Sequence, residues 1–286
     1  MSITSTMAET VAAAPVDGAA AAEEVAAFLR GVLGADVDIQ PGARLVDDLA
    51  LDSMQRLELL AWLSTRGADV GAAEVAALVT VRDVAGLVSQ TTRPHGDTTE
   101  ATATPQSWMV AAPTRRHDER FALSPLTPEI MPFLYQLAIS EEVGFRWRFR
   151  GNVPPFEAFQ AGLSRGVHVQ FVVADRRSGE PVGHVVAYNA DHNLGLCYVG
   201  GAFVPRLISS GLPMEVMAMF ARYLFQVWPF RKLYLEVPEF NYTLIASGAG
   251  RYFDVEGRLT EHSYYSGRYW DEYLLALRRH HVGLAR

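Results

Sequence analysis

The hydrophobic pattern of the chain is helical in its first third and strand-like in most of the remainder. Apolar residues from Val25 to Leu33 recur at the three- and four-residue spacing of one helix face. A second helix is predicted to begin at Asp52, a candidate N-cap, and two more are predicted near 73–78 and 80–88. Four helices in about seventy residues indicate a small bundle.

Beyond residue 118 the pattern alternates between strands and helices. Three consecutive strands joined by short turns predict an antiparallel meander, which a helix and a further strand follow. We therefore predict a multidomain chain, with an all-α four-helix bundle followed by an α+β domain whose mixed sheet is mostly antiparallel. The predicted strands are 168–174, 182–188, 195–204, 233–237 and two near 257–266 and 269–277, and the predicted helices start near 127, 154 and 217.

Two segments show neither periodicity and are rich in Thr, Ala and Pro. They predict a flexible N-terminus at 1–19, a helical domain at 20–90, a flexible linker at 91–118 and a second domain at 119–286. As a coil, the linker would span about 30 Å. It would keep the two domains near each other without fixing their orientation.

Charge is concentrated in the first third, where residues 1–100 carry a net charge of −9 and residues 101–286 carry +2. An acidic domain favours basic partner surfaces and disfavours nucleic acid, whose phosphates bind clustered Lys and Arg. No stretch approaches the ~20 apolar residues of a membrane span. The first 29 residues hold no Lys or Arg, so the predicted location is cytoplasmic rather than secreted.

Cys197 is the only cysteine of the chain. One cysteine builds neither an internal disulfide nor a cysteine-based zinc site, and no metal site is predicted. We expect Cys197 to be a buried strand residue.

The segment LVDDLALDSMQRLELL, residues 45–60, resembles the signature of acyl carrier proteins, and the resemblance extends over 20–90. An Asp-Ser pair at a helix start is usually only a cap, but here it follows a long loop and opens the second of four helices. The resemblance implies that a phosphopantetheinyl transferase attaches 4′-phosphopantetheine to an exposed Ser53. It also implies that an acyl-loading enzyme or synthase docks on an acidic face, unless that face is only solvated: Asp47, Asp48, Asp52 and Glu58.

The run from Phe203 to Leu277 resembles the GNAT superfamily of acyltransferases, in the branch of the ribosomal-protein N-terminal acetyltransferases, and the resemblance extends over 119–279. In that family a loop before a helix binds the pyrophosphate of coenzyme A; here it reads PRLISSGLP, with Ser209 at a usual glycine and Pro213 lacking an N–H. The resemblance implies contacts to coenzyme A or acyl-CoA by Phe203, Val204, Arg206, Ser209, Ser210, Gly211, Leu212 and, at the end of YLEVPEFN, Asn241.

The chemistry of that family is attack of an amine on a thioester held between two parting strands. Its usual glutamate and tyrosine align here with Leu196 and Gly248, so the general base and acid stay open. Four candidates are Glu236, His184, Ser247 and Tyr252, although Glu236 suits a surface ion pair and His184 a core position equally well. The segment FRWRFRG, residues 145–151, is either part of the acceptor pocket or a loop packed on the core.

Two enzymatic functions and one non-enzymatic function follow. In the first, an acyl group on the Ser53 arm or on coenzyme A passes to a small-molecule amine in polyketide or nonribosomal-peptide biosynthesis. In the second, the arm carries the acceptor, an amino-acyl group or its own thiol, which is acetylated from acetyl-CoA. In the third, the C-terminal domain only docks or protects the cargo of the carrier.

Overall fold

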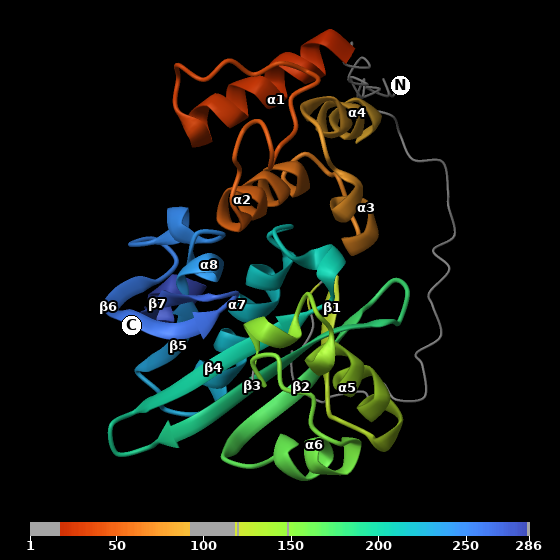
Figure 1. The fold of residues 1–286 in the computed structure, drawn as a ribbon. Coiled ribbons are helices and arrows are strands. Elements are labelled where there is room, and N and C mark those ends of the chain that lie inside the picture. Colours follow the sequence, from red (N-terminus) through yellow and green to blue (C-terminus); the bar gives the residue numbers. More distant parts are fainter. Residues whose placement is uncertain (1–17, 92–117, 119, 148, 285–286) are drawn as a thin grey trace, which may run out of the picture.

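The computed structural model describes residues 18–91, 118, 120–147 and 149–284 (Figure 1). Most of the two segments predicted to be flexible therefore lies outside the described residues. The N-terminal domain is the predicted helical bundle, and its four helices are α1 (Gly18–Leu33), α2 (Ser53–Ser64), α3 (Ala72–Ala77) and α4 (Val81–Thr91).

The helical bundle is held by the apolar stripe that the sequence predicted. Val25 and Leu29 of α1 are fully buried, as is Val84 of α4, and the two helices pack against each other. Burying each such side chain contributes about 1.5–3 kcal/mol to the free energy of folding. Between these two positions of α1, Phe28 stacks on Trp62 of α2 with ring centroids 4.8 Å apart.

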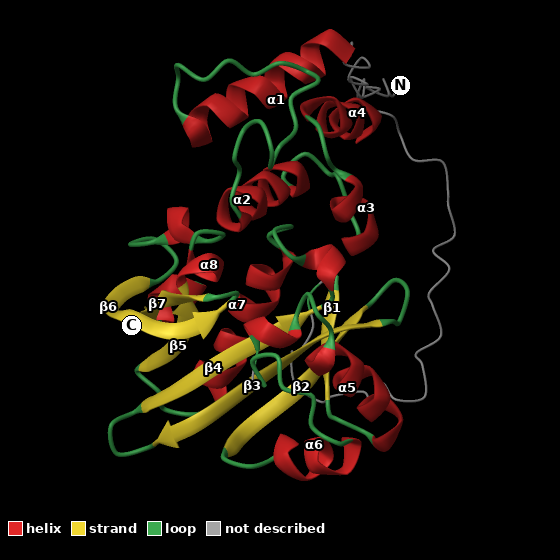
Figure 2. Cartoon of the chain, viewed as in Figure 1, coloured by secondary structure: helices red, strands yellow, loops and turns green. Residues whose placement is uncertain are grey.

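The C-terminal domain contains one seven-stranded sheet in the order β1-β2-β3-β4-β5-β7-β6 (Figure 2). All neighbouring strands are antiparallel except β4 and β5, which confirms the predicted mixed sheet. The strands are β1 (Phe121–Ser124), β2 (Val167–Asp175), β3 (Pro181–Asp191), β4 (Leu196–Phe203), β5 (Lys232–Pro238), β6 (Asp254–Tyr265) and β7 (Arg268–Leu277), and the helices are α5 (Met131–Ile139), α6 (Phe156–Leu163), α7 (Leu212–Val227) and α8 (Glu239–Tyr242).

Alternate residues of β2 contribute to two separate cores. Phe171 and Val173 of β2 belong to the buried cluster that contains α7, whereas Val172 and Ala174 belong to the cluster that contains α5 and α6. Cys197 lies on β4 and is buried, as predicted, and burial raises the pKa of its thiol to about 11. The sheet is thus covered by helices on both faces.

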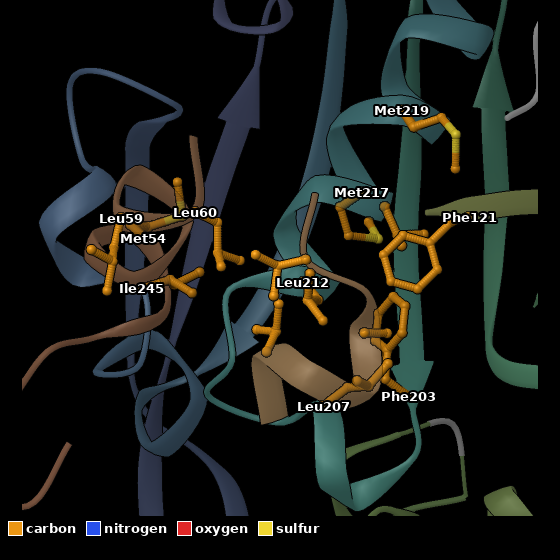
Figure 3. Close-up of a cluster of buried hydrophobic side chains, with 14 of the residues drawn as sticks. Met54, Leu59, Leu60, Phe121, Phe203, Leu207, Leu212, Met217, Met219 and Ile245 are labelled. Atoms are coloured by element: carbon orange, nitrogen blue, oxygen red, sulfur yellow. The ribbon is translucent and has the colours of Figure 1, made fainter. Parts of the chain in front are cut away.

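The two domains are in direct contact, with α2 lying against the start of α7 (Figure 1). One continuous cluster of buried apolar side chains includes residues of both. Figure 3 shows Met54 and Leu60 of α2 on the same side as Ile245, with Leu212 of α7 next to them. Among the described residues, no helix could cross a membrane and no group of side chains suits a metal ion.

Candidate active site

The site begins at the N-terminus of α2, where Ser53 is the first helical residue. The carboxylate of Asp52 accepts hydrogen bonds from the N–H groups of Met54 and Gln55 at 3.0 Å, and the Gln55 side chain accepts one from the N–H of Asp52 at 2.9 Å. This is the predicted capping arrangement. The predicted exposure of Ser53 is wrong: only 5% of the residue is exposed, because the C-terminal domain packs over it. The carbonyl oxygen of Leu244 accepts a hydrogen bond from the Ser53 N–H at 2.7 Å.

A groove of about 180 Å³ leads from Ser53 into the C-terminal domain between β4 and β5. The two strands pair only over residues 196–198 and 232–234 and then part, as the GNAT resemblance implied. Backbone groups beyond the last pair have no partner in the other strand of this pair. Of the residues predicted to bind coenzyme A, the groove is lined by Phe203, Ser209 and Asn241.

A second cavity, of about 400 Å³, adjoins the inner part of the groove. Glu236 of β5 and Tyr188 of β3 both line it. Burial, together with the charge of Glu236, raises the pKa of Tyr188 to about 12. Tyr188 is therefore a neutral donor throughout the physiological pH range. The charged residues lining this cavity are Arg146, Arg150, Arg165, Glu236 and Glu272.

The groove, which Ser53 also lines, and the cavity share part of their walls and meet at a junction. Because the shared residues come from β4, β5, α8 and the turn before α6, this junction forms only in the folded protein. The shared residues are Arg146, Trp147, Gly201, Leu235, Val237 and Asn241.

The segment 145–151 combines the two interpretations left open by its sequence. Arg146 and Arg150 line the cavity, so the segment forms part of its wall. Trp147 is 9% exposed and also packs edge-on against His184, at 5.1 Å between ring centroids. Arg150 donates to Ser263 at 2.8 Å and pairs with the buried Glu272 at 3.5 Å. A pocket wall and a core contact are thus built from adjacent residues.

The loop predicted to hold pyrophosphate contacts the N-terminal domain instead of open solvent. Gly211 has a φ of +86°, and a Cβ placed there would lie 2.7 Å from Leu57 N and from Ser53 O. Ser210 and Leu212 are buried, and the Ser210 hydroxyl donates to Leu207 O at 2.6 Å. The turn of the loop therefore fits directly against the first turn of α2.

Residues 23–88 match a family model described as the phosphopantetheine attachment site. The N-terminal domain is a phosphopantetheine carrier domain. The match includes Ser53, the residue that the sequence placed at the attachment point. No curated protein matches the chain.

The C-terminal part is similar in fold to solved spermidine N-acetyltransferases of Vibrio cholerae. One, in complex with coenzyme A and spermine, is 18% identical, with 58% of this chain and 99% of that chain covered and a TM-score of 0.49. A chimera of that enzyme with hSSAT is also 18% identical, with 57% and 97% covered and a TM-score of 0.48.

The carrier domain is held at the site by hydrogen bonds to its attachment helix. The Asp52 carboxylate, which caps α2, also accepts hydrogen bonds from the N–H and the hydroxyl of Ser247, at 2.9 and 2.7 Å. Glu58 pairs with Arg251 at 2.5 Å and accepts a hydrogen bond from Tyr252 at 3.1 Å. Two of the four acidic residues expected to contact partners therefore face the C-terminal domain.

A second group of contacts lies farther along the carrier domain. Arg177 pairs with Asp69 at 2.5 Å and with Glu74 at 2.8 Å. Arg120 donates to Val70 O at 2.6 Å and pairs with Glu215 at 3.0 Å. Basic residues of the C-terminal domain thus face the acidic carrier domain, and the contacts are of opposite charge.

The other acidic residues proposed for docking stay within the carrier domain. Asp47 pairs with Arg44 at 2.9 Å, and Asp48 accepts a hydrogen bond from the Arg44 N–H at 2.7 Å. Both lie on the loop before α2. Their part in contacting a separate synthase stays a prediction.

Exchanging the charges of Glu58 and Arg251 tests whether their pairing positions the carrier domain. Each single reversal, E58R or R251E, is expected to slow acyl transfer from the arm several-fold because like charges would then meet, and the double exchange is expected to restore most of the rate. A coupling of about 0.2–1 kcal/mol is typical of an exposed pair. The transfer rates of the four proteins are measured as single-turnover loss of the acyl group, followed by intact-protein mass spectrometry, and their ratios give the coupling energy. R30E, which breaks the Arg30–Glu23 pair inside the carrier domain, is the control.

Of the four candidates for acid or base, Glu236 is the one that lines the larger cavity. His184 is fully buried, hydrogen-bonded to Gln170 at 3.0 Å, and lines neither the groove nor the cavity. Ser247 and Tyr252 contact the carrier domain. Burial and the nearby Glu58 raise the pKa of Tyr252, so its hydroxyl keeps its proton.

The remaining residues predicted to bind coenzyme A are distributed around the loop. Arg206 pairs with Glu180 at 3.4 Å on the surface, and Val204 packs between the two buried clusters. Neither lines the groove or the cavity. Sequence reasoning missed Tyr188 and Glu272 as cavity residues, because no motif connects them to Glu236.

Proposed function

We propose that this chain is an N-acyltransferase whose donor is an acyl thioester on its own Ser53 arm and whose acceptor is an amine bound in the larger cavity. The observation that carries the proposal is the position of Ser53 at the mouth of the groove that meets this cavity. Phosphopantetheine ends in the same thiol as coenzyme A. An arm attached at Ser53 would follow the groove and place its thioester at the junction.

The docked carrier domain favours the arm over free coenzyme A as the donor. Its α2 contacts the loop around Gly211, where the pyrophosphate of coenzyme A would otherwise bind. Ser209 adopts a φ of +63° and Pro213 offers no N–H, so the loop also departs from the usual anion site in sequence. An arm tethered within one chain reaches an effective concentration on the order of millimolar.

Transfer itself is an aminolysis. The amine nitrogen bonds to the thioester carbon, the carbon–sulfur bond breaks, and the sulfur leaves as the thiolate of the arm. Glu236 is the proposed base that takes the proton of the attacking amine, and the neutral Tyr188 lines the same cavity. Alignment of the two reactants at the junction supplies much of the rate.

The same proposal assigns the partners. A phosphopantetheinyl transferase attaches the arm, and a separate acyl-loading enzyme or synthase charges it, in a cytoplasmic natural-product pathway of the polyketide or nonribosomal-peptide type. Ser53 is buried while the carrier domain is docked, so both enzymes need the undocked state. Acidic residues released on undocking, Asp52 and Glu58, would then be free for these partners.

The proposal is tested by comparing a donor on the arm with a donor in solution. Full-length protein is charged with acetyl-phosphopantetheine from acetyl-CoA by a broad-specificity transferase, and hydroxylamine or a primary amine is added. We expect amide formation in a single turnover, with the arm returning to the free thiol. S53A with acetyl-CoA in solution is expected to retain under about 1% of that rate, since millimolar tethering is lost.

Three results would contradict the proposal. Wild-type rates from acetyl-CoA in S53A would make coenzyme A the donor. Acetylation of an amino-acyl group or thiol on the arm from acetyl-CoA would make the arm the acceptor. Aminolysis of the charged protein no faster than that of acetyl-CoA alone would leave the C-terminal domain as a docking module.

A further inference from the structure

Arg146 occupies the point where the groove and the cavity meet. Arg146 lines both, and it is the one charged residue among the described residues that the two walls share. It lies in the helical turn Gly144–Arg146, at the start of the aromatic segment 145–151. If the arm enters from Ser53 and the amine binds beside Glu236, the carbonyl under attack is located next to this guanidinium.

The guanidinium is held in place on several sides. Its Nη1 donates to the Asn241 Oδ1 of α8. Its carbon lies 4.6 Å from the ring centre of Phe145 and 5.5 Å from that of Phe240. Phe145 in turn stacks on Tyr265 of β6, at 3.9 Å and 5° between planes. Side chains fixed by such contacts need no reorganisation when charge develops beside them.

Arg146 has no anionic partner among the described residues. It forms no ion pair there, and its buried Nε has no hydrogen-bond partner. By contrast, Arg150 in the same cavity pairs with Glu272. Burial lowers the pKa of Arg146, but a guanidinium stays charged at neutral pH. A half-buried cation without a counter-ion is costly unless an anion arrives during function.

We propose that Arg146 is a catalytic residue that stabilises the negative charge formed on the thioester during transfer, and that Asn241 positions it. The proposal rests on the proposed function. As the amine attacks, the carbonyl electron pair moves to oxygen, next to the guanidinium. When the carbon–sulfur bond breaks, that pair returns to form the amide and the bonding electrons leave with the sulfur. The amine proton passes to Glu236, and from there through solvent to the thiolate, which is paired with Arg146 as it leaves; the arm thus returns as a thiol and Glu236 as a carboxylate.

The test uses full-length acetyl-charged protein and hydroxylamine, an acceptor that carries no anion. R146Q is expected to lower the maximal single-turnover rate by about 10²–10³-fold, the usual effect of removing one such donor, without changing the half-saturating hydroxylamine concentration. R146K is expected to recover part of the loss. R268Q is the control, because Arg268 stacks over Trp270 at 3.4 Å but lines neither the groove nor the cavity.

A second measurement separates catalysis from structure. The rate at which iodoacetamide alkylates the free thiol of the arm, in protein that carries no acyl group, is measured as a function of pH. This rate reports the pKa of the thiol, which R146Q is expected to raise. A wild-type rate in R146Q would overturn this inference while leaving the proposed function intact. A loss confined to acceptors with a carboxylate, such as alanine, would instead make Arg146 a substrate-binding residue. No transfer by the wild type would contradict the proposed function itself.

Discussion

Replacing Gly211 with alanine is expected to slow transfer from the arm about 100-fold, the usual effect of misplacing reactants by about 1 Å. The new Cβ would lie 2.7 Å from Leu57 N and Ser53 O, and these are backbone atoms that cannot move aside without shifting α2. The carrier domain would therefore lose its docked position. Attachment of the arm by a transferase is expected to become faster at the same time, because Ser53 would be released from its 5% exposure.

The control for this substitution is G283A. Gly283 has a φ of +75° and open space around its Cβ position, so alanine brings the same backbone strain, about 1–3 kcal/mol, without touching the carrier domain. Thermal unfolding of both variants shows that cost, and time courses by intact-protein mass spectrometry give the two rates. Normal transfer together with normal arm attachment in G211A would mean that the docked arrangement is not the reactive one.

Replacing Gly201 with valine is expected to lower the transfer rate to less than about 1% of the wild-type rate, while attachment of the arm stays unchanged. Gly201 lies on β4 where the groove meets the cavity. A Cβ there would lie 2.9 Å from Met217 Sδ and 3.0 Å from Phe203 Cε2, so these side chains would be displaced into the passage. The contact between α2 and the Gly211 loop would stay intact.

G257V is the matched control, since a Cβ at Gly257 of β6 meets only Leu274, at an ordinary 3.7 Å. Single-turnover transfer and transferase-dependent arm attachment are measured on both valine variants. If G201V transfers as fast as G257V, the arm does not pass between β4 and β5. Together, G211A and G201V separate docking of the carrier domain from passage of the arm.

Local features were largely predictable from the sequence. The start of α2 was predictable because Asp52 and Gln55 are three residues apart, and the side chain of each accepts a hydrogen bond from the backbone N–H of the other. The long strands were also predictable, since alternation over six or more residues leaves little ambiguity. Strand β1 was not, because its four residues are too few to show a period. Helix α8, of the same length, was missed for the same reason.

The arrangement of the two domains was not predictable. Asp52 satisfies its role as a cap with local partners, and nothing in the sequence shows that Ser247, 195 residues away, also bonds to it. Arg146 is one of several arginines in an aromatic segment, and it is distinguished only by its position at the junction. Both properties depend on contacts between distant segments, which residue patterns along the chain do not encode.

The junction of α2 with the Gly211 loop lies within one polypeptide. A donor delivered this way meets its catalytic cleft at a frequency set by the connecting chain rather than by collisions between molecules. Diluting the charged protein would therefore leave the rate of the transfer step in each molecule unchanged, and a sparse enzyme in a crowded cell would consume its acyl group as quickly as an abundant one.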